Sequence, residues 1–267
     1  MKELEQALAV LHKYYGYPSF KPIQERAVNS ILNGRDTFVI MPTGGGKSVC
    51  YQVPALLFEG LTIVISPLIS LMKDQVDNLE ALGVHAAYIN STLTAQEYGA
   101  VKRRVYSREV KILYVAPERL NVADFMEMLS GLKVDFVAVD EAHCVSQWGH
   151  DFRPSYGQIQ QFIADLPVRP VVAAFTATAT QEVRYDVIKQ LGLERPNIYR
   201  ASFNRPNLEL IVNSDANKLE TLLDFVVARQ AEAGIIYCST RKEVERLWEE
   251  LNAQGLRTLK YHGGMNE

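Results

Sequence analysis

Two short stretches of this 267-residue chain carry residue types that could handle a phosphorylated ligand. The first is MPTGGGKS at residues 41–48, and the second is AVDEAH at residues 138–143. Glycines let backbone N–H groups turn towards phosphate oxygens, a lysine supplies a cation, and a serine hydroxyl can bind Mg²⁺. Adjacent carboxylates are suited to holding a metal ion and to taking a proton from water. Together the two stretches predict nucleotide chemistry.

The first stretch fits the register of a phosphate-binding loop between a predicted strand and a predicted helix. Lys47 is expected to contact the β- and γ-phosphates, and Ser48 is expected to bind Mg²⁺. The pattern usually begins with glycine, whereas this chain has Met41. A glycine-rich turn without function is the alternative, and the strand–loop–helix context argues against it. The predicted nucleotide-binding residues of the loop are Met41, Pro42, Thr43, Gly44, Gly45, Gly46, Lys47 and Ser48.

The second stretch ends an apolar run with Asp140 and Glu141. Asp140 is predicted to hold Mg²⁺, and Glu141 to orient and deprotonate an attacking water molecule. An acidic pair can also simply end a strand and cap the next helix. The phosphate-binding loop upstream makes the catalytic interpretation the stronger one.

Short apolar runs alternate with segments of helical period along residues 37–192. Such alternation predicts an α/β fold, with a parallel sheet covered by helices on both faces. In sheets of this kind, sites gather at the carboxyl ends of the strands. The predicted strands are 37–41, 61–66, 85–90, 111–116, 135–140 and 171–176, and the predicted helices are 70–82, 95–107 and 180–192.

The pattern changes after about residue 200, where a connector rich in turn signals begins. We therefore expect one domain over 1–205 and a second α/β unit over 206–267. The second unit is predicted to hold helices at 218–230 and 241–254 and strands at 234–239 and 258–262. A unit of this size buries little surface by itself.

Two further stretches predict a site less strongly. Tyr17, Lys21 and Gln24 lie just before the phosphate-binding loop, where they could stack on a purine and bond its edge. Aromatic residues near a chain start are more often core anchors. Thr176 and Thr178 lie at the end of another predicted strand and could bridge the carboxylates to a neighbouring element. Threonine before a helix is also an ordinary N-cap.

The stretch SQWGHDFRPSY at residues 146–156 concentrates Trp148, His150, Phe152 and Tyr156 around Arg153. A water-exposed loop gains nothing from so much aromatic surface unless a flat partner lies on it. The alternative is that Trp148 and Phe152 pack inward as a plug at a domain interface. Because the loop follows Glu141 closely, we expect it to couple a flat ligand to the carboxylate site.

Bulk properties narrow the class of protein. Hydrophobic residues make up 48% and charged residues 22%, as in ordinary globular domains. No apolar run approaches the ~20 residues that span a bilayer. The three cysteines show no C-x-x-C spacing, which argues against a zinc site and for a reducing, cytoplasmic setting. Because the net charge is −3, any binding of nucleic acid must come from a local group of residues rather than from the overall charge of the protein.

In order, the motifs resemble those of one family. They are FKPIQ, MPTGGGKS, SPLISLMKDQV, APERL, DEAHC, SQWGHDFRPSY, FTATAT, SFNRPN and GIIYCSTR. This set resembles the RecQ family of superfamily 2 DNA helicases over about residues 15–265. The aromatic loop after the DEAH box points to this family in particular.

The resemblance implies two RecA-like domains, with 206–267 the beginning of the second. It implies an ATP-dependent 3′-to-5′ helicase that acts on single-stranded and partial-duplex DNA in repair and recombination. A bacterial cytoplasm or nucleoid is the implied location, whereas protein partners are not predicted. A nucleotide-gated DNA-binding module without unwinding activity is the alternative. An RNA-directed DEAH-type ATPase is disfavoured by the aromatic loop.

The resemblance also implies roles for individual residues. Tyr17, Lys21 and Gln24 would contact adenine, and Ser48 and Asp140 would hold the Mg²⁺ of Mg·ATP. The implied catalytic residues are Lys47, Asp140, Glu141 and His143. The implied DNA-binding and coupling residues are Trp148, His150, Phe152, Arg153, Thr176 and Thr178. The family's arginine finger has no counterpart before Glu267, so we expect the chain to be a fragment that hydrolyses little ATP alone.

Overall fold

The computed structural model describes residues 2–149, 151–202, 207–214 and 217–265. The chain divides into two compact units, Met1–Arg205 and Pro206–Glu267. Among the described residues, three hydrophobic clusters lie in the first unit and one lies in the second. Among the described residues, no helix has both the length and the apolar character needed to cross a membrane.

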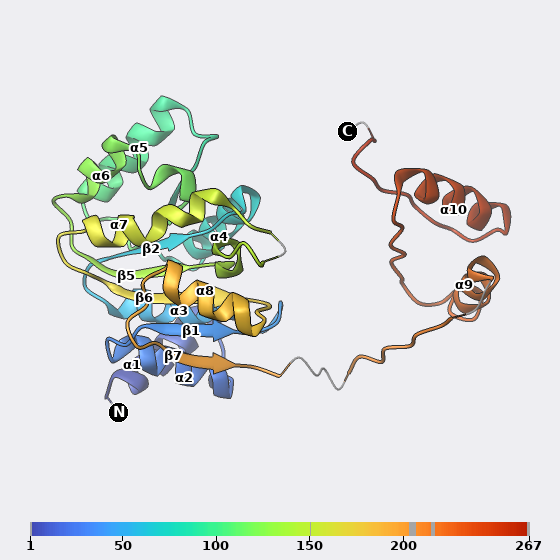
Figure 1. Cartoon of the computed structure of the whole chain (residues 1–267), viewed down its shortest axis with the longest axis horizontal. Helices are drawn as coiled ribbons and strands as arrows, with labels where there is room; N and C mark the ends of the chain where they lie inside the picture. Colours follow the sequence, from blue (N-terminus) through green and yellow to red (C-terminus); the bar gives the residue numbers. More distant parts are fainter. Residues whose placement is uncertain (1, 150, 203–206, 215–216, 266–267) are drawn as a thin grey trace. The chain divides into compact units, whose positions relative to one another are not determined.

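The first unit is built on a parallel sheet whose strand order is β3-β4-β2-β5-β6-β1-β7 (Figure 1). All six predicted strands are present. The seventh strand was not predicted, because it is short, polar and largely exposed at the sheet edge. The strands are β1 Thr37–Ile40, β2 Leu61–Ile65, β3 Ala86–Ile89, β4 Ile112–Val115, β5 Val134–Val139, β6 Val171–Thr176 and β7 Asn197–Arg200.

Helices connect the strands, and the three predicted helices are confirmed within two residues at each end. Their starts are set by ordinary caps: the Thr94 hydroxyl accepts from Glu97 N at the start of α5. The α-helices are α1 Lys2–Tyr15, α2 Pro22–Leu32, α3 Lys47–Leu57, α4 Ile69–Ala81, α5 Ala95–Tyr106, α6 Ala123–Leu129, α7 Ile159–Asp165 and α8 Gln181–Gln190. Short 3₁₀ turns are η1 Pro117–Arg119, η2 Ala142–Val145 and η3 Pro154–Gln158.

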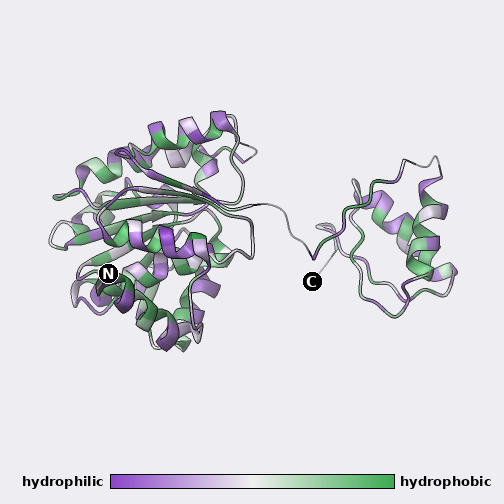
Figure 2. Cartoon of the chain, turned by 90° about the horizontal axis from the view of Figure 1, so that it is seen from below, coloured by the Kyte–Doolittle hydropathy of each residue, from purple (hydrophilic) through white to green (hydrophobic). Residues whose placement is uncertain are grey.

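The sheet is buried on both faces, as the near-continuous apolar runs predicted. Phe38 and Ile40 of β1 point into a cluster shared with α5 to α8. Val39, between them, points into the opposite cluster, shared with α2, α3 and α4. Figure 2 shows the strands as a predominantly hydrophobic band between layers of helices that carry both polar and apolar residues. The predicted α/β fold with helices on both faces is therefore confirmed.

A buried carboxylate joins the amino ends of the strands. Asp36, 4% exposed, precedes β1 and accepts from both terminal nitrogens of Arg169, at 3.2 and 2.6 Å. It also accepts from the backbone N–H groups of Val172 and Glu194, at 3.0 and 2.7 Å. One side chain thus connects β1 to β6 and to the segment that leads into β7.

The second unit is a pair of helices, α9 Lys218–Val227 and α10 Arg241–Ala253, around a small leucine cluster. Both helices were predicted. The strands predicted at 234–239 and 258–262 are wrong, since the described residues there form no ladder. Tyr237 is 90% exposed and Leu259 is 99% exposed. A β-strand requires a neighbour to pair with, and β-forming residues alone do not supply one.

We predict that Asp36→Ala lowers the free energy of unfolding by about 3 kcal/mol, because it leaves buried donors and a partly buried guanidinium without their acceptor. The matched control is Glu194→Gln, which removes the other carboxylate bound to Arg169 but at a site 72% exposed. Its cost should be no more than about 1 kcal/mol. Urea unfolding of both variants tests this, and equal losses would contradict it.

Candidate functional site

The loop between β1 and α3 has a backbone that requires glycine. Gly44 and Gly46 have φ values of 76° and 85°, in the left-handed region that glycine adopts without strain. A Cβ atom on Gly45 would lie 2.4 Å from Cγ of Met41 and 2.8 Å from the Pro42 carbonyl oxygen. The loop is therefore a tight cradle at the amino end of α3, as anion binding at a helix N-terminus needs.

Side chains on either side of the loop hold it in place. Lys47 Nζ donates to the carbonyl oxygen of Met41 at 3.3 Å. The Gln24 side-chain amide donates to the carbonyls of Gly45 and Gly46, at 3.2 and 3.3 Å. The Gln24 carbonyl oxygen accepts from the backbone N–H of Lys21 at 2.9 Å. The Gln24 side chain thus supports the loop by bonding the loop's backbone carbonyls. Tyr17, the aromatic residue predicted to act with Gln24, has a side chain that is 55% exposed.

The carboxyl group of Asp140 lies at the end of β5 in an environment that disfavours its charge. Burial, with a smaller effect from the neighbouring Glu141 carboxylate, raises its pKa to about 6. The Glu141 backbone N–H donates to it at 3.0 Å and offsets part of this increase. Tyr156 OH donates to the Asp140 backbone carbonyl at 2.9 Å, which holds the strand end from the next loop.

A hydrogen-bond network joins the ends of β5 and β6. His143 Nδ1 lies 2.9 Å from Thr176 Oγ1 and 3.3 Å from Glu141 Oε2. Thr176 Oγ1 donates to the Thr178 carbonyl at 3.0 Å, so it must accept from His143. This pattern assigns the proton of a neutral His143 ring to Nδ1. His143 thus lies between Thr176 and Glu141. Glu141 makes this contact from a strained backbone with φ of 46°.

The aromatic loop contains residues of two kinds. Trp148 is 76% exposed and Phe152 is 42% exposed, so neither packs inward as a plug within the first unit. Tyr156 is fully buried, and the expectation that it adds to the exposed aromatic surface is wrong. Its ring belongs to the hydrophobic core, and its buried hydroxyl finds a hydrogen-bond partner in the Asp140 backbone carbonyl. His150 lies outside the described residues.

Arg153 fixes the aromatic loop through contacts that we did not predict. Its guanidinium donates to Asp151 Oδ2, at 3.2 and 3.0 Å, and to the Pro67 carbonyl at 2.9 Å. The hydrogen bond with Arg153 lowers the pKa of the Asp151 carboxyl. Cys144, next to His143, places its sulfur 3.7 Å from Asp151 Oδ2. Asp151, an acidic residue between Trp148 and Phe152 and two positions before Arg153, was the sequence signal that could have predicted these contacts.

A cavity of about 330 Å³ opens where these elements meet. Thr43 of the phosphate-binding loop, Glu141 and His143 of the box, and Asp151 of the aromatic loop all line it. The remaining lining residues are Pro67, Leu68, Ala177 and Thr178. Five motifs, drawn from four separate parts of the sequence, therefore share one cavity at the carboxyl edge of the sheet. Tyr17 and Lys21 are not among its lining residues.

The donor set at this edge fits Mg²⁺ with a nucleotide. Mg²⁺ takes few protein ligands, preferably a carboxylate, together with water and phosphate oxygens. Asp140 supplies a desolvated carboxylate whose charge a cation would stabilise. Ser48 offers a hydroxyl in the first turn of α3, beside the glycine cradle. The residues present therefore fit the ion that the sequence predicted.

Comparisons with known proteins agree with this site. Residues 21–186 match the DEAD/DEAH box helicase family. The chain is 48% identical to the ATP-dependent DNA helicase RecQ of Pasteurella multocida, covering 98% of this chain and 41% of that protein. The RecQ protein of Bacillus subtilis is also 48% identical, with 98% and 44% covered. The chain thus spans less than half the length of each of these two relatives.

Solved structures confirm the fold. A hypothetical ATP-dependent RNA helicase from Sulfolobus tokodaii is similar with a TM-score of 0.57 at 22% identity, covering 93% of this chain and 72% of that one. The Hef helicase domain of Pyrococcus furiosus gives 0.53 at 20% identity, covering 87% and 53%. Similarity at this level of identity shows the RecA-like helicase fold alone. The resemblance to RecQ helicases expected from the motifs is confirmed by the sequence matches.

We predict that Asp140→Asn stabilises the ligand-free chain at neutral pH. A folded-state pKa of about 6, above the usual value of ~3.9, means that the ionised carboxylate destabilises the fold. This penalty is at most about 3 kcal/mol above pH 6 and disappears as the pH falls towards 4 and the folded chain takes up the proton. The stability gained by the variant should therefore shrink over that window.

Unfolding free energies at pH 7.5, 6 and 4.5, with a chelator present, measure this gain. Asp74→Asn, at an exposed position of α4, is the control and should change stability little at any pH. A gain for Asp140→Asn that does not depend on pH would contradict the explanation.

Proposed function

We propose that this chain, which belongs to the DEAD/DEAH box helicase family, forms the ATP-binding domain and part of a second RecA-like domain of a 3′-to-5′ DNA helicase. The enzyme would couple hydrolysis of Mg·ATP to movement along single-stranded DNA and to unwinding of partial duplexes. Its relatives that carry the name ATP-dependent DNA helicase RecQ support DNA as the substrate. Residues 1–205 would be the first domain and 206–267 would belong to the second.

The observation that carries this proposal is the contact between the DEAH box and the loops around it. His143 bonds Thr176 at 2.9 Å, while Asp151 of the aromatic loop lies against Cys144. Arg153 then joins that loop to Pro67, after β2. A displacement of the box would be transmitted to the loop that presents Trp148. Such contiguous contacts are one physical route by which an ATP site and a DNA site are coupled.

In the proposed nucleotide site each residue has one task. Lys47 would leave the Met41 carbonyl to contact the β- and γ-phosphates, which the glycine cradle surrounds with N–H groups. Ser48 and Asp140 would hold Mg²⁺, which neutralises phosphate charge when bound. Glu141 would accept the proton of the attacking water. His143 would hold the Glu141 carboxylate and, through its hydrogen bond to Thr176, connect that carboxylate to the end of β6.

Adenine recognition by Tyr17, Lys21 and Gln24 remains part of the proposal. The hydrogen bonds from Gln24 to Gly45 and Gly46 support this role. If adenine bound to Gln24, any shift of that side chain would change its hydrogen bonds to the phosphate-binding loop. Tyr17 is exposed and could stack on the base. Lys21 lacks the planar fork of arginine, so its contribution would be a single charge rather than a stacked contact.

The proposed DNA contacts are Trp148, His150, Phe152 and Arg153, with Thr176 and Thr178 as coupling residues. Exposed aromatic rings bind single strands by stacking on bases, which needs no particular sequence. The exposure of Trp148 and Phe152 supports this role. Arg153 is held by Asp151 and Pro67, and we assign it to positioning the loop as well as to contact with phosphate.

We expect Trp148→Ala to weaken binding of a dye-labelled oligothymidine by about ten-fold, since stacking contributes ~1–3 kcal/mol per base. Fluorescence anisotropy at one fixed salt concentration measures the affinity. The matched control is Tyr106→Ala at the end of α5, which removes an aromatic ring that is 47% exposed and precedes β4, at the amino edge of the sheet. Equal affinity of the Trp148 variant and the parent would show that the loop does not bind DNA.

A further inference from the structure

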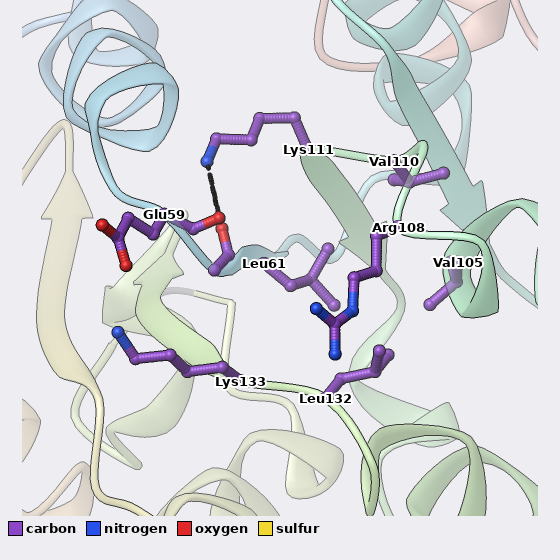
Figure 3. Close-up of a pocket in the computed structure, with 9 residues that line it drawn as sticks. Glu59, Leu61, Val105, Arg108, Val110, Lys111, Leu132 and Lys133 are labelled. Carbon is purple, nitrogen blue, oxygen red and sulfur yellow. Dashed lines mark hydrogen bonds between the residues drawn. The ribbon is translucent and has the colours of Figure 1, made fainter.

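A second cavity, of about 360 Å³, lies at the amino ends of the strands, opposite to the proposed nucleotide site (Figure 3). Leu61 begins β2 on one side of it. Lys111 precedes β4 and Lys133 precedes β5. Val105 and Val110, 2% and 5% exposed, add to its apolar wall. Nothing in the proposed helicase mechanism uses this edge of the sheet.

The cavity borders the basic stretch KRRVYSREVK, residues 102–111, whose cations have separate roles. Lys102 forms an ion pair with Asp124. Arg104 pairs with two glutamates, at 2.8 and 2.7 Å. Lys111 donates to three successive backbone carbonyls, those of residues 58–60. These three cations are thus engaged in holding the fold.

Arg108 is different. Within the described ranges, its guanidinium makes no hydrogen bond or ion pair. Lys133 pairs with Asp135 at 3.1 Å. In Figure 3, the charged ends of Lys133 and Glu59 point away from Arg108, whose guanidinium extends over the side of the cavity near Leu132. The cavity therefore contains one cation that the fold does not use.

The backbone of Arg108 is strained at a position that four other helices of this chain fill with glycine. It follows the C-cap of α5 and has φ of +60°, in the left-handed region. The residues after the C-caps of α2, α4, α8 and α10 are all glycines with positive φ: Gly34, Gly83, Gly192 and Gly255. Glycine is favoured there because it has no Cβ. An arginine at this position has a Cβ and is therefore less stable there than glycine. Within the described residues, no hydrogen bond or ion pair of its guanidinium compensates for this cost.

We propose that this cavity binds a small organic monoanion, with its carboxylate on Arg108 and its apolar part against Leu61, Val105 and Val110. A guanidinium presents a planar fork that matches a carboxylate. Because one cation in the cavity is unpaired within the described residues, a ligand with a single negative charge would match it. Because the wall is apolar, the rest of that ligand should be a hydrocarbon group. The volume lies at the lower end of the ~300–1,000 Å³ range for small-molecule sites.

Benzoate is the probe, and benzamide is its neutral counterpart of the same shape. We expect benzoate to shift the ¹³C-methyl NMR signals of Leu61, Val105 and Val110 of the 30.1 kDa chain at millimolar concentration, and benzamide to bind about ten-fold more weakly or worse. Phenyl phosphate, which carries a second charge, should bind no better than benzoate. If it binds much better, the site is one for phosphate esters and the carboxylate assignment is wrong.

Arg108→Gly is the decisive variant, because it removes the guanidinium and relieves the backbone. It should bind benzoate about ten-fold more weakly while its melting temperature stays the same or rises. Arg108→Asn, which also tolerates the left-handed region, should behave alike. Arg103→Ala, at an exposed arginine of α5 outside the cavity, should bind as the parent does. Unchanged binding in both Arg108 variants, or equal binding of benzoate and benzamide, would overturn the proposal.

Discussion

The site depends on one constraint, the order of strands in a parallel sheet. Because β5, β6 and β1 are neighbours and all run in one direction, their carboxyl ends meet at one edge. The register pairs Ile40 with Thr176, so the phosphate-binding loop and the threonine motif leave the sheet side by side. The box follows β5 on the other side of β6. Asp36 and Arg169 secure this arrangement from the opposite edge, where they connect β1 to β6.

The same edge combines a buried carboxyl group, a strained glutamate and a glycine loop, each of which lowers stability. The Asp140 carboxyl is desolvated, and Glu141 has a left-handed backbone without being glycine. Proteins retain such features where the ligand rather than the fold benefits from them. Tyr156, His143 and Arg153 offset part of the cost by hydrogen-bonding the backbone and side chains around the box. Local instability and ligand binding are therefore two consequences of the same arrangement at this edge of the sheet.

Much of this could be predicted from the sequence, because buried parallel strands and glycine-rich loops have local signatures. The six apolar runs became strands, and the motifs at their ends came together. Contacts between distant residues have no such signature: the role of Asp151 and the burial of Tyr156 depend on how a loop folds back on β5. The error at residues 234–239 has the same origin, since strand-forming residues such as Ile235 need a partner that local sequence does not reveal.

The most direct test of the account is calorimetric titration of the chain with Mg·ADP, comparing the parent with Lys47→Ala and with Lys73→Ala. Lys47 is the cation of the cradle, whereas Lys73 is an exposed lysine of α4 outside the cavity. We predict that Lys47→Ala binds about 10- to 100-fold more weakly, the effect expected for loss of a charged hydrogen bond to phosphate. Lys73→Ala should bind as the parent does. Unchanged affinity in a folded Lys47→Ala chain would contradict the assignment of this edge as the nucleotide site.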